Sequence, residues 1–146
     1  QYEISNFAKP DAECRHNMNT WRMHEWIGCG PSSASQYNGE RYQRPANLEE
    51  WCLGMESTTS PRTEHITLDD NLLLADAVIF GLRMNSGVDL KTLNLRFAHA
   101  TNRIDLEAKL NFFVKEGLLK SKDTHYALTH QGRLLCDSLG SDLLDV

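Results

Sequence analysis

Side chains that can do chemistry gather near the start of the chain, over residues 14–35. The segment contains cysteine, histidine, asparagine, tryptophan and glycine at close spacing: Cys14, His16, Asn17, Trp21, Trp26, Gly28, Cys29 and Gly30. An imidazole or a thiolate can bind a metal ion, an indole can stack on a flat ring, and a glycine lets the backbone approach a ligand. We therefore expect any chemistry of this chain to lie in this segment.

Each of these side chains also has an ordinary structural use. A lone histidine commonly holds a loop by hydrogen bonds, tryptophans pack into cores, and Gly28 and Gly30 are typical of a tight turn. The two cysteines and two histidines of residues 14–29 match no usual zinc spacing. From the residues alone, a loop-holding histidine is the simpler interpretation of His16.

The composition is that of an ordinary globular protein of 146 residues, with 40% hydrophobic and 24% charged residues. A net charge of -5 argues against nucleic acid as a partner, because sequence-independent binding needs a basic surface. No apolar run approaches the ~20 residues of a membrane span, and we expect no signal peptide at the polar start. The four cysteines form no C-x-x-C pair, so we expect free thiols and a cytoplasmic location.

The N-terminal half predicts short strands and loops. We expect a strand over residues 1–8 and a loop with one helical turn over 12–24. A short strand over 25–29 and a polar loop over 36–46 should follow. A helix should follow Asn47, a good N-cap with Glu50 at the third helical position. Its apolar residues recur at helical spacing and predict one buried stripe of Leu48, Trp51, Cys52 and Met55.

The C-terminal half is more regular. Residues 54–62 contain serine, threonine and proline and are the best linker, so we place a domain boundary near residue 60. Beyond it the pattern predicts, in order, a helix capped by Thr67, helices over 89–97 and 104–116, a hairpin over 118–128 and a helix capped by Thr129. The apolar residues expected to face inward on the first and last helices are Leu72, Ala75, Ile79, Leu82, Leu134, Leu135 and Leu139. Three helices, a two-stranded wing and a last helix predict a winged-helix-like module over 61–146.

Several segments together resemble a known family. Residues 2–10 with the following Arg15-His16-Asn17 resemble the radical-SAM oxygen-independent coproporphyrinogen III oxidases and their heme-chaperone relatives. Residues 16–21 are similar to the H-N-x-x-Y-W motif of the chaperone branch, and residues 27–35 to its I-G-x-G-P-G-A-H-S segment. Weaker similarity continues through residues 81–83, 87–89, 117–119 and 128–132, so the resemblance covers nearly the whole chain.

The resemblance implies an α+β fragment. Residues 1–60 would be the last strands of a partial β/α radical-SAM barrel, and residues 61–146 a winged-helix-like, α-helical C-terminal domain. The family's barrel holds S-adenosylmethionine and a [4Fe–4S] cluster, but its C-x-x-x-C-x-x-C cluster motif is absent from this sequence. We therefore expect this chain alone to be inactive and the missing N-terminal half of the barrel to be its partner.

The resemblance also assigns ligand residues. The implied heme contacts are His16, Asn17 and Trp21, with the imidazole of His16 on the heme iron. The implied S-adenosylmethionine contacts, at the end of a barrel strand, are Ile27, Gly28 and Gly30. This chain departs from the motifs at Thr20, which replaces a tyrosine, and at Ala34, which replaces a histidine. Two side chains keep open roles: Cys14 as a thiolate ligand or a free thiol, and Glu3 as a barrel-lining or an exposed carboxylate.

The implied function is that of a heme chaperone, which binds heme and delivers it to heme-accepting proteins. The first alternative is an oxygen-independent coproporphyrinogen III oxidase, which makes protoporphyrinogen IX by oxidative decarboxylation in porphyrin biosynthesis. Whether the parent protein is an enzyme therefore stays open, although the histidine motif favours the chaperone. The second alternative, a winged-helix binding module, predicts salt-sensitive DNA binding. The third predicted helix, with more acidic than basic residues, argues against it.

Overall fold

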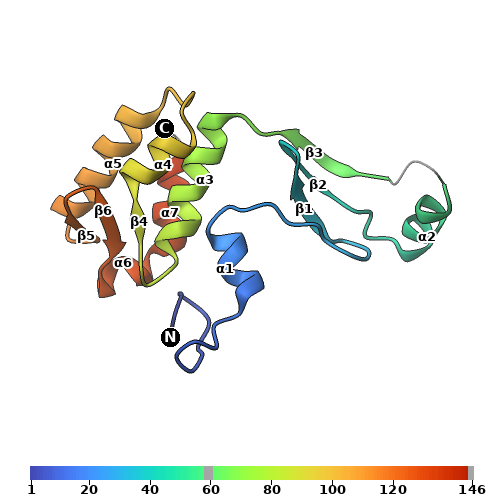
Figure 1. Cartoon of the computed structure of the whole chain (residues 1–146), viewed down its shortest axis with the longest axis horizontal. Coiled ribbons are helices and arrows are strands. Elements are labelled where there is room, and N and C mark those ends of the chain that lie inside the picture. Colours follow the sequence, from blue (N-terminus) through green and yellow to red (C-terminus); the bar gives the residue numbers. More distant parts are fainter. Residues whose placement is uncertain (58–60, 145–146) are drawn as a thin grey trace. The chain divides into compact units, whose positions relative to one another are not determined.

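The structure, a computed structural model, describes residues 1–57 and 61–144 (Figure 1). The chain divides into two compact units, one formed by Gln1–Met23 with Asp70–Val146 and the other by His24–Asp69. We call them the helical unit and the hairpin unit. The predicted domains 1–60 and 61–146 stay a prediction about the longer family members, since the compact units group the chain differently. Of the predicted linker 54–62, residues 58–60 lie outside the described residues.

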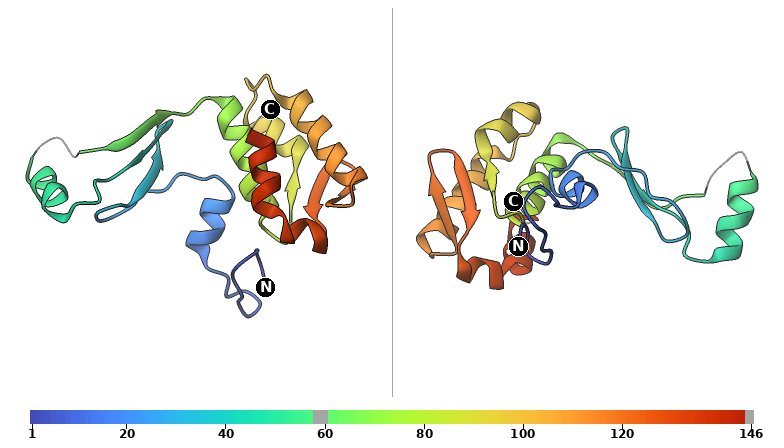
Figure 2. Two further views of the ribbon diagram at one scale, coloured as in Figure 1. Left: turned by 180° about the vertical axis from the view of Figure 1, so that it is seen from behind. Right: turned by 60° about the horizontal axis from the view of Figure 1, so that its bottom comes forward.

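The helical unit contains most of the regular structure. Its helices are α1 (Arg15–Trp21), α3 (Asp70–Leu82), α4 (Leu90–Arg96), α5 (Arg103–Lys115), α6 (His130–Leu134) and α7 (Cys136–Leu144). Its strands are β4 (Val88–Asp89), β5 (Leu119–Lys122) and β6 (His125–Leu128), which pair antiparallel in the order β4-β6-β5. Helix α7 lies alongside α3 in Figure 1 and in the rear view of Figure 2.

Helix α3 is the centre of the core. Its buried residues point in all directions around the helix: Leu74, Ala75, Asp76, Ala77, Val78, Gly81 and Leu82. The prediction of a single inward face was therefore too narrow, because α3 packs against α1, α4, α7 and the sheet at once. A helix that is apolar on all sides is the expected form for a position surrounded by other elements.

Side-chain caps begin two helices of this unit, and the cap predicted at Thr129 is confirmed. The carboxylate of Asp89 accepts from the backbone N–H of Lys91 at 3.2 Å, and the hydroxyl of Thr129 accepts from Gly132 at 3.1 Å. Hydrogen bonds from Thr124 and then Thr92 hold the pKa of Asp89 below its ordinary value. The helices predicted over 89–97 and 104–116 and the hairpin after them are confirmed.

Two predictions in the C-terminal half were wrong. Thr67 ends a strand rather than capping a helix, and α3 begins at Asp70. The last helix is broken into α6 and α7 at Leu135, so only Leu139 of its three predicted inward leucines is buried. Leu134 is 76% exposed, because the break turns its side chain away from the core.

The expected strand over residues 1–8 is reduced to one isolated bridge between Glu3 and Met84. Around this bridge Ile4 donates to the carbonyl of Arg83 at 3.1 Å, and Asn85 donates to that of Tyr2 at 3.0 Å. The segment then turns back on itself through a bond from the N–H of Tyr2 to the carbonyl of Asn6. A strand needs a neighbour along its length, and here the neighbour is the short turn after α3.

The hairpin unit contains β1 (Ala34–Tyr37), β2 (Glu40–Gln43), α2 (Leu48–Glu56) and β3 (Thr63–Thr67). The three strands form an antiparallel sheet in the order β1-β2-β3. The polar loop predicted over 36–46 was wrong, because Asn38-Gly39 forms the two-residue turn of a hairpin. The strand predicted over 25–29 is reduced to a single bridge between Trp26 and Gln36.

Helix α2 begins as predicted and packs differently. The side chain of Asn47 accepts from the N–H of Glu50 at 3.0 Å, which confirms the N-cap. The buried stripe was wrong, since Leu48 is 60% and Met55 54% exposed and no residue of α2 is buried. The α+β class is confirmed across the described residues. None of the described helices is both long and apolar enough to cross a bilayer.

Candidate functional site

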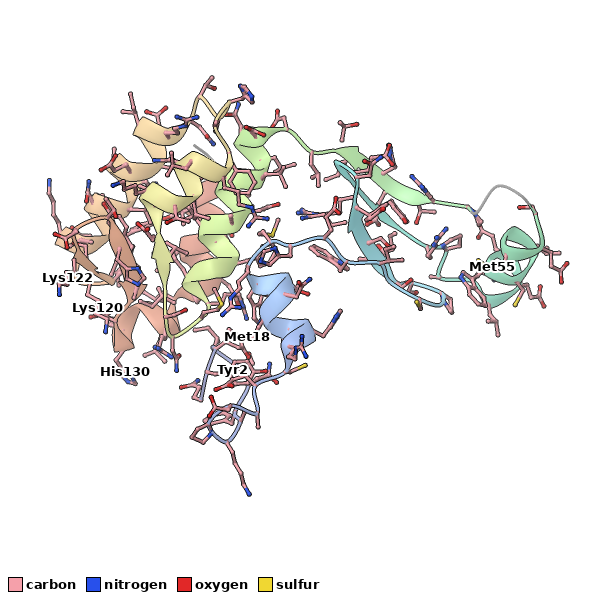
Figure 3. All side chains as sticks on the ribbon, in the orientation of Figure 1. Tyr2, Met18, Met55, Lys120, Lys122 and His130 are labelled. Carbon is pink, nitrogen blue, oxygen red and sulfur yellow. The ribbon has the colours of Figure 1, made fainter. Side chains whose placement is uncertain are left out.

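The histidine motif folds into α1 of the helical unit, a longer helix than the single turn predicted (Figure 3). His16 and Trp21 lie five positions apart, which puts them about 140° apart around a helix of 3.6 residues per turn. The motif therefore divides between two faces of one helix. His16 is exposed, and Trp21 is half-buried.

The imidazole of His16 makes no hydrogen bond to any described residue, whereas its backbone carbonyl accepts from Thr20 at 3.2 Å. The loop-holding role that composition favours thus has no hydrogen bond to support it in the described part of the chain. An exposed imidazole on a helix can coordinate a metal ion without losing an internal hydrogen bond. Asn17 beside it is half-buried and donates from Nδ2 to the hydroxyl of Tyr2 at 3.4 Å.

Trp21 packs against the end of α3. Its ring lies 5.8 Å from that of Phe80, centroid to centroid, with the two planes inclined by 33°. The guanidinium carbon of Arg83 lies 5.1 Å from the indole centroid, within the range of a cation–π contact. These contacts match the core-packing alternative for Trp21. The residues just after α1 are tied to α4 as well, because Arg96 donates to the carbonyls of Arg22, at 2.7 Å, and Met23.

Buried polar atoms meet where the N-terminal segment, α1 and α3 come together. Glu3 is fully buried, and its Oε1 accepts from the N–H of Ser5 at 3.0 Å and the side-chain amide of Asn6 at 2.5 Å. The predicted exposed environment of Glu3 is therefore wrong, and a barrel-lining role stays a prediction for the longer parent protein. Among the described residues no partner reaches Glu3 Oε2, Trp21 Nε1 or Arg83 Nε. Buried polar atoms without a partner are uncommon and often mark sites of function.

Arg83 was missed by sequence reasoning. It ends the residues 81–83 that carry a weak family resemblance, and nothing about that triplet indicates a neighbour far along the chain. Besides its place over Trp21, Arg83 forms an ion pair of 2.9 Å with Asp137. Burial raises the pKa of the nearby Cys136 thiol, and the positive charge of Arg83 opposes that shift. Cys136 is therefore a neutral thiol at pH 7.

The residues assigned to S-adenosylmethionine lie in the hairpin unit, whereas the heme candidates lie in the helical unit. Ile27 is 59% exposed. The N–H of Gly28 donates to Ser35 Oγ at 3.0 Å, and a Cβ at Gly28 would overlap the carbonyl of Ala34. Gly30 has a φ of +96°, which favours glycine. Local packing and turn geometry thus account for both glycines without a ligand.

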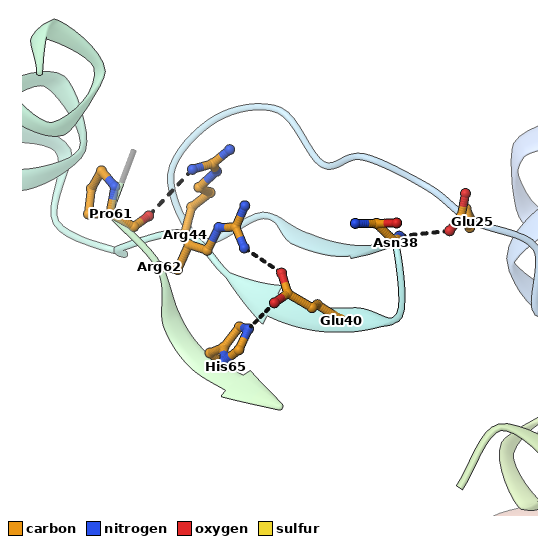
Figure 4. Close-up of polar contacts among 7 residues, drawn as sticks. All are labelled: Glu25, Asn38, Glu40, Arg44, Pro61, Arg62 and His65. Atoms are coloured by element: carbon orange, nitrogen blue, oxygen red, sulfur yellow. Dashed lines mark hydrogen bonds and ion pairs between the residues drawn. The ribbon is translucent and has the colours of Figure 1, made fainter. Parts of the chain in front are cut away.

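A polar network that sequence reasoning missed joins β2 to β3 (Figure 4). Glu40 forms ion pairs with Arg62 at 2.7 Å and with His65 at 3.1 Å. The hydrogen bond from His65, followed by that from Arg62, lowers the pKa of the Glu40 carboxyl. Arg62 also lies over the ring of Tyr42, with 4.1 Å between its guanidinium carbon and the ring centroid. This exposed network links β2 to β3.

The described residues contain no group of three or more histidine, cysteine or acidic side chains that could hold a metal ion. All four cysteines are free: Cys14, Cys29, Cys52 and Cys136. Cys14 is exposed immediately before α1, so the structure leaves it accessible.

Residues 68–135 match the family model of the HemN C-terminal domain. This part of the chain is therefore similar to a HemN C-terminal domain. The match runs from the residue pair before α3 to the end of α6, which is most of the helical unit's regular structure. The resemblance read from the motifs, to the coproporphyrinogen oxidase family with its heme-chaperone relatives, is confirmed.

Curated relatives extend the similarity beyond the HemN C-terminal domain. The chain is 29% identical over 143 residues to the heme chaperone HemW of Mycobacterium tuberculosis, covering 98% of this chain and 34% of that protein. It is 26% identical over 137 residues to HemW of Bacillus subtilis, covering 92% and 35%. It is 36% identical over 96 residues to the mitochondrial radical S-adenosyl methionine domain-containing protein 1 of Danio rerio, covering 60% and 22%. The chain thus spans about a third or less of the length of these relatives.

A solved structure shares the fold. Coproporphyrinogen III oxidase (HemN) from Escherichia coli, a radical SAM enzyme, superposes with a TM-score of 0.69 at 17% identity. The match covers 97% of this chain and 37% of that one. At this identity the match shows a common fold alone, and the chemistry has to be argued from the residues.

Proposed function

We propose that this chain is the C-terminal part of a cytoplasmic heme chaperone, which binds heme and passes it to heme-accepting proteins. The observation that carries the proposal is the exposed imidazole of His16 on α1, in a chain that aligns over 98% of its length with a HemW heme chaperone. His16 is the proposed axial ligand, because imidazole is a common protein ligand of heme iron.

The residues around His16 fit such a ligand. Heme iron takes four nitrogens from the porphyrin, so a single accessible imidazole suffices where no three-residue metal group exists among the described residues. Asn17, tethered to Tyr2, lies beside His16 and is proposed to contact the heme. Trp21 is held by Phe80 and Arg83, so we assign it to fixing α1 in place and, through α1, positioning His16.

The proposed roles of S-adenosylmethionine and of a [4Fe–4S] cluster concern the longer parent protein. Its N-terminal part would hold S-adenosylmethionine and a [4Fe–4S] cluster in a partial β/α barrel, to which this chain adds the last segments. Ile27, Gly28 and Gly30 remain the proposed contacts to S-adenosylmethionine in that setting. The order of α3, α4, α5 and the β5–β6 hairpin supports a winged-helix-like C-terminal domain, here a structural module rather than a DNA reader.

Heme titration of the chain tests the role of His16. We expect a shifted Soret absorbance band with the wild type, its loss in His16→Ala, and no change in His130→Ala. His130 is a matched control, because it is an exposed histidine near a helix start in the same unit and lies far from α1 (Figure 3). A spectrum and affinity unaffected by His16→Ala would refute the assignment.

The second candidate function is an oxygen-independent coproporphyrinogen III oxidase, favoured by the fold shared with HemN of Escherichia coli. This reading needs the full-length parent, because oxidative decarboxylation would require the cluster and S-adenosylmethionine. Formation of protoporphyrinogen IX by the full-length protein separates the two functions. Sustained turnover would favour the oxidase, and heme binding without turnover would favour the chaperone.

A further inference from the structure

Two arginines accompany His16 on α1. Arg15 is the first residue of the helix, and Arg22 follows its last residue, with its N–H still bonded to the carbonyl of Met18 at 3.1 Å. Both side chains are exposed. Seven positions fall about 20° short of two helical turns, so the two arginines share one face and lie about 10 Å apart along the axis. We call this pair the arginine face.

The arginine face, His16 and Trp21 occupy three different sides of α1. Around a helix of 3.6 residues per turn, both arginines lie about 100–120° from His16 in one direction, and Trp21 lies about 140° away in the other. The packing of Trp21 against Arg83 therefore uses neither His16 nor the arginine face. A flat ligand held by His16 can extend over the arginine face.

Neither arginine has a structural use among the described residues. Their guanidinium groups take part in no ion pair or hydrogen bond within the described part of the chain. Helix α1 contains no acidic residue, and its first turn is a place where the helix dipole disfavours a cation. Arg15 therefore gains nothing from its position in the helix. Water alone solvates many surface arginines, so the position beside His16 is what distinguishes this pair.

The arginine face is positive in a protein that is acidic overall. The net charge is -5, and the nearest acidic residues in sequence are Glu13 and Glu25. Glu25 is engaged elsewhere, since its Oε1 accepts from the N–H of Asn38 at 2.7 Å. A positive patch on an acidic protein directs an anionic group to that patch. An anion-attracting surface therefore lies next to the proposed iron ligand.

We propose that Arg15 and Arg22 bind the two propionate carboxylates of the heme. This inference rests on the proposed heme-binding function and names the chemical group that the site recognises. A guanidinium presents parallel N–H donors that match a carboxylate, and it stays charged throughout the physiological pH range. The propionates leave one edge of an otherwise apolar ring, and the flexible arginine and propionate chains span the distance along α1. The arginines thereby fix which edge of the heme faces α1, while His16 holds the iron.

Removal of charge from the ligand and from the protein tests this recognition. Soret titrations of the chain compare hemin with its neutral diamide, in which both propionates are amides and the iron is unchanged. We expect the wild type to bind hemin about five- to tenfold more tightly than the diamide, as two exposed charge pairs allow. The double variant Arg15→Gln/Arg22→Gln should bind the two probes equally. No preference in the wild type, or a preference that survives in the double variant, would overturn the proposal.

Lys120 and Lys122 supply the matched control. They are two exposed cations on β5, far from α1 (Figure 3), and Lys120→Gln/Lys122→Gln changes the net charge by the same amount. This variant should keep the preference for hemin over the diamide. An equal loss of preference in both double variants would show that net charge, and not the arginine face, is responsible.

The carboxylate contact and the iron ligand have separate readouts. The ratio of hemin to diamide affinity reports the arginine face, whereas the Soret band of His16→Ala reports the iron ligand. At saturation the arginine double variant should keep the Soret position of the wild type, because His16 still holds the iron. Loss of that position would mean that the two changes distort α1, and it would contradict a role confined to the carboxylates.

Discussion

The guanidinium of Arg83 lies over the indole of Trp21, with 5.1 Å between the guanidinium carbon and the ring centroid. The two residues are far apart in sequence and join α1 to the C-terminal end of α3. This contact decides which face of α1 is packed. It therefore also decides that His16, on the other side of the helix, stays exposed.

Removing Arg83 should loosen α1 without unfolding the chain. Arg83→Ala loses the contact with Trp21 and the ion pair with Asp137, which together should lower the free energy of opening α1 by about 1–2 kcal/mol. Hydrogen exchange of the α1 amides measures that opening. Arg15→Ala, which removes an exposed arginine of the same helix, should change the exchange little. Equal acceleration in both variants would contradict a specific anchoring role for Arg83.

Glu3 should matter through its hydrogen bonds. Glu3→Ala leaves the N–H of Ser5 and the amide of Asn6 without their acceptor, and we expect a loss of about 1–3 kcal/mol in the free energy of unfolding. Glu3→Gln keeps one carbonyl oxygen for these donors and should be clearly milder. Urea unfolding followed by circular dichroism compares the three proteins. If Gln were as damaging as Ala, the charge of Glu3 and not its hydrogen bonds would be responsible.

The carboxyl of Glu40 should titrate below its ordinary pKa of 4.5, with His65 as the main cause and Arg62 as the second. A depressed pKa in the folded state stabilises the protein above the unfolded value, and that contribution is lost as the pH falls through the folded value. NMR titration of the carboxyl carbon should show the pKa rising toward 4.5 in His65→Ala and rising less in Arg62→Ala. The opposite order would show that the arginine dominates the network.

The sequence could predict the parts of the fold that depend on neighbours along the chain. The N-caps at Asn47 and Thr129, the helices over 89–97 and 104–116 and the hairpin after them follow from local hydrogen bonding and backbone preference. The motif around His16, together with the C-terminal segments, was enough to predict the family. Each of these signals consists of residues close together in the sequence, so it can be recognised without knowledge of the fold.

Only the tertiary structure decided what each apolar or polar side chain meets. Spacing predicted a buried stripe on α2 and a single inward face on α3. In the fold α2 has no buried residue, while α3 is surrounded. Glu3 meets Met84, and Trp21 meets Arg83, only because the N-terminal segment and α1 pack on the end of α3. Burial depends on contacts between distant segments, and no periodicity within one segment carries that information.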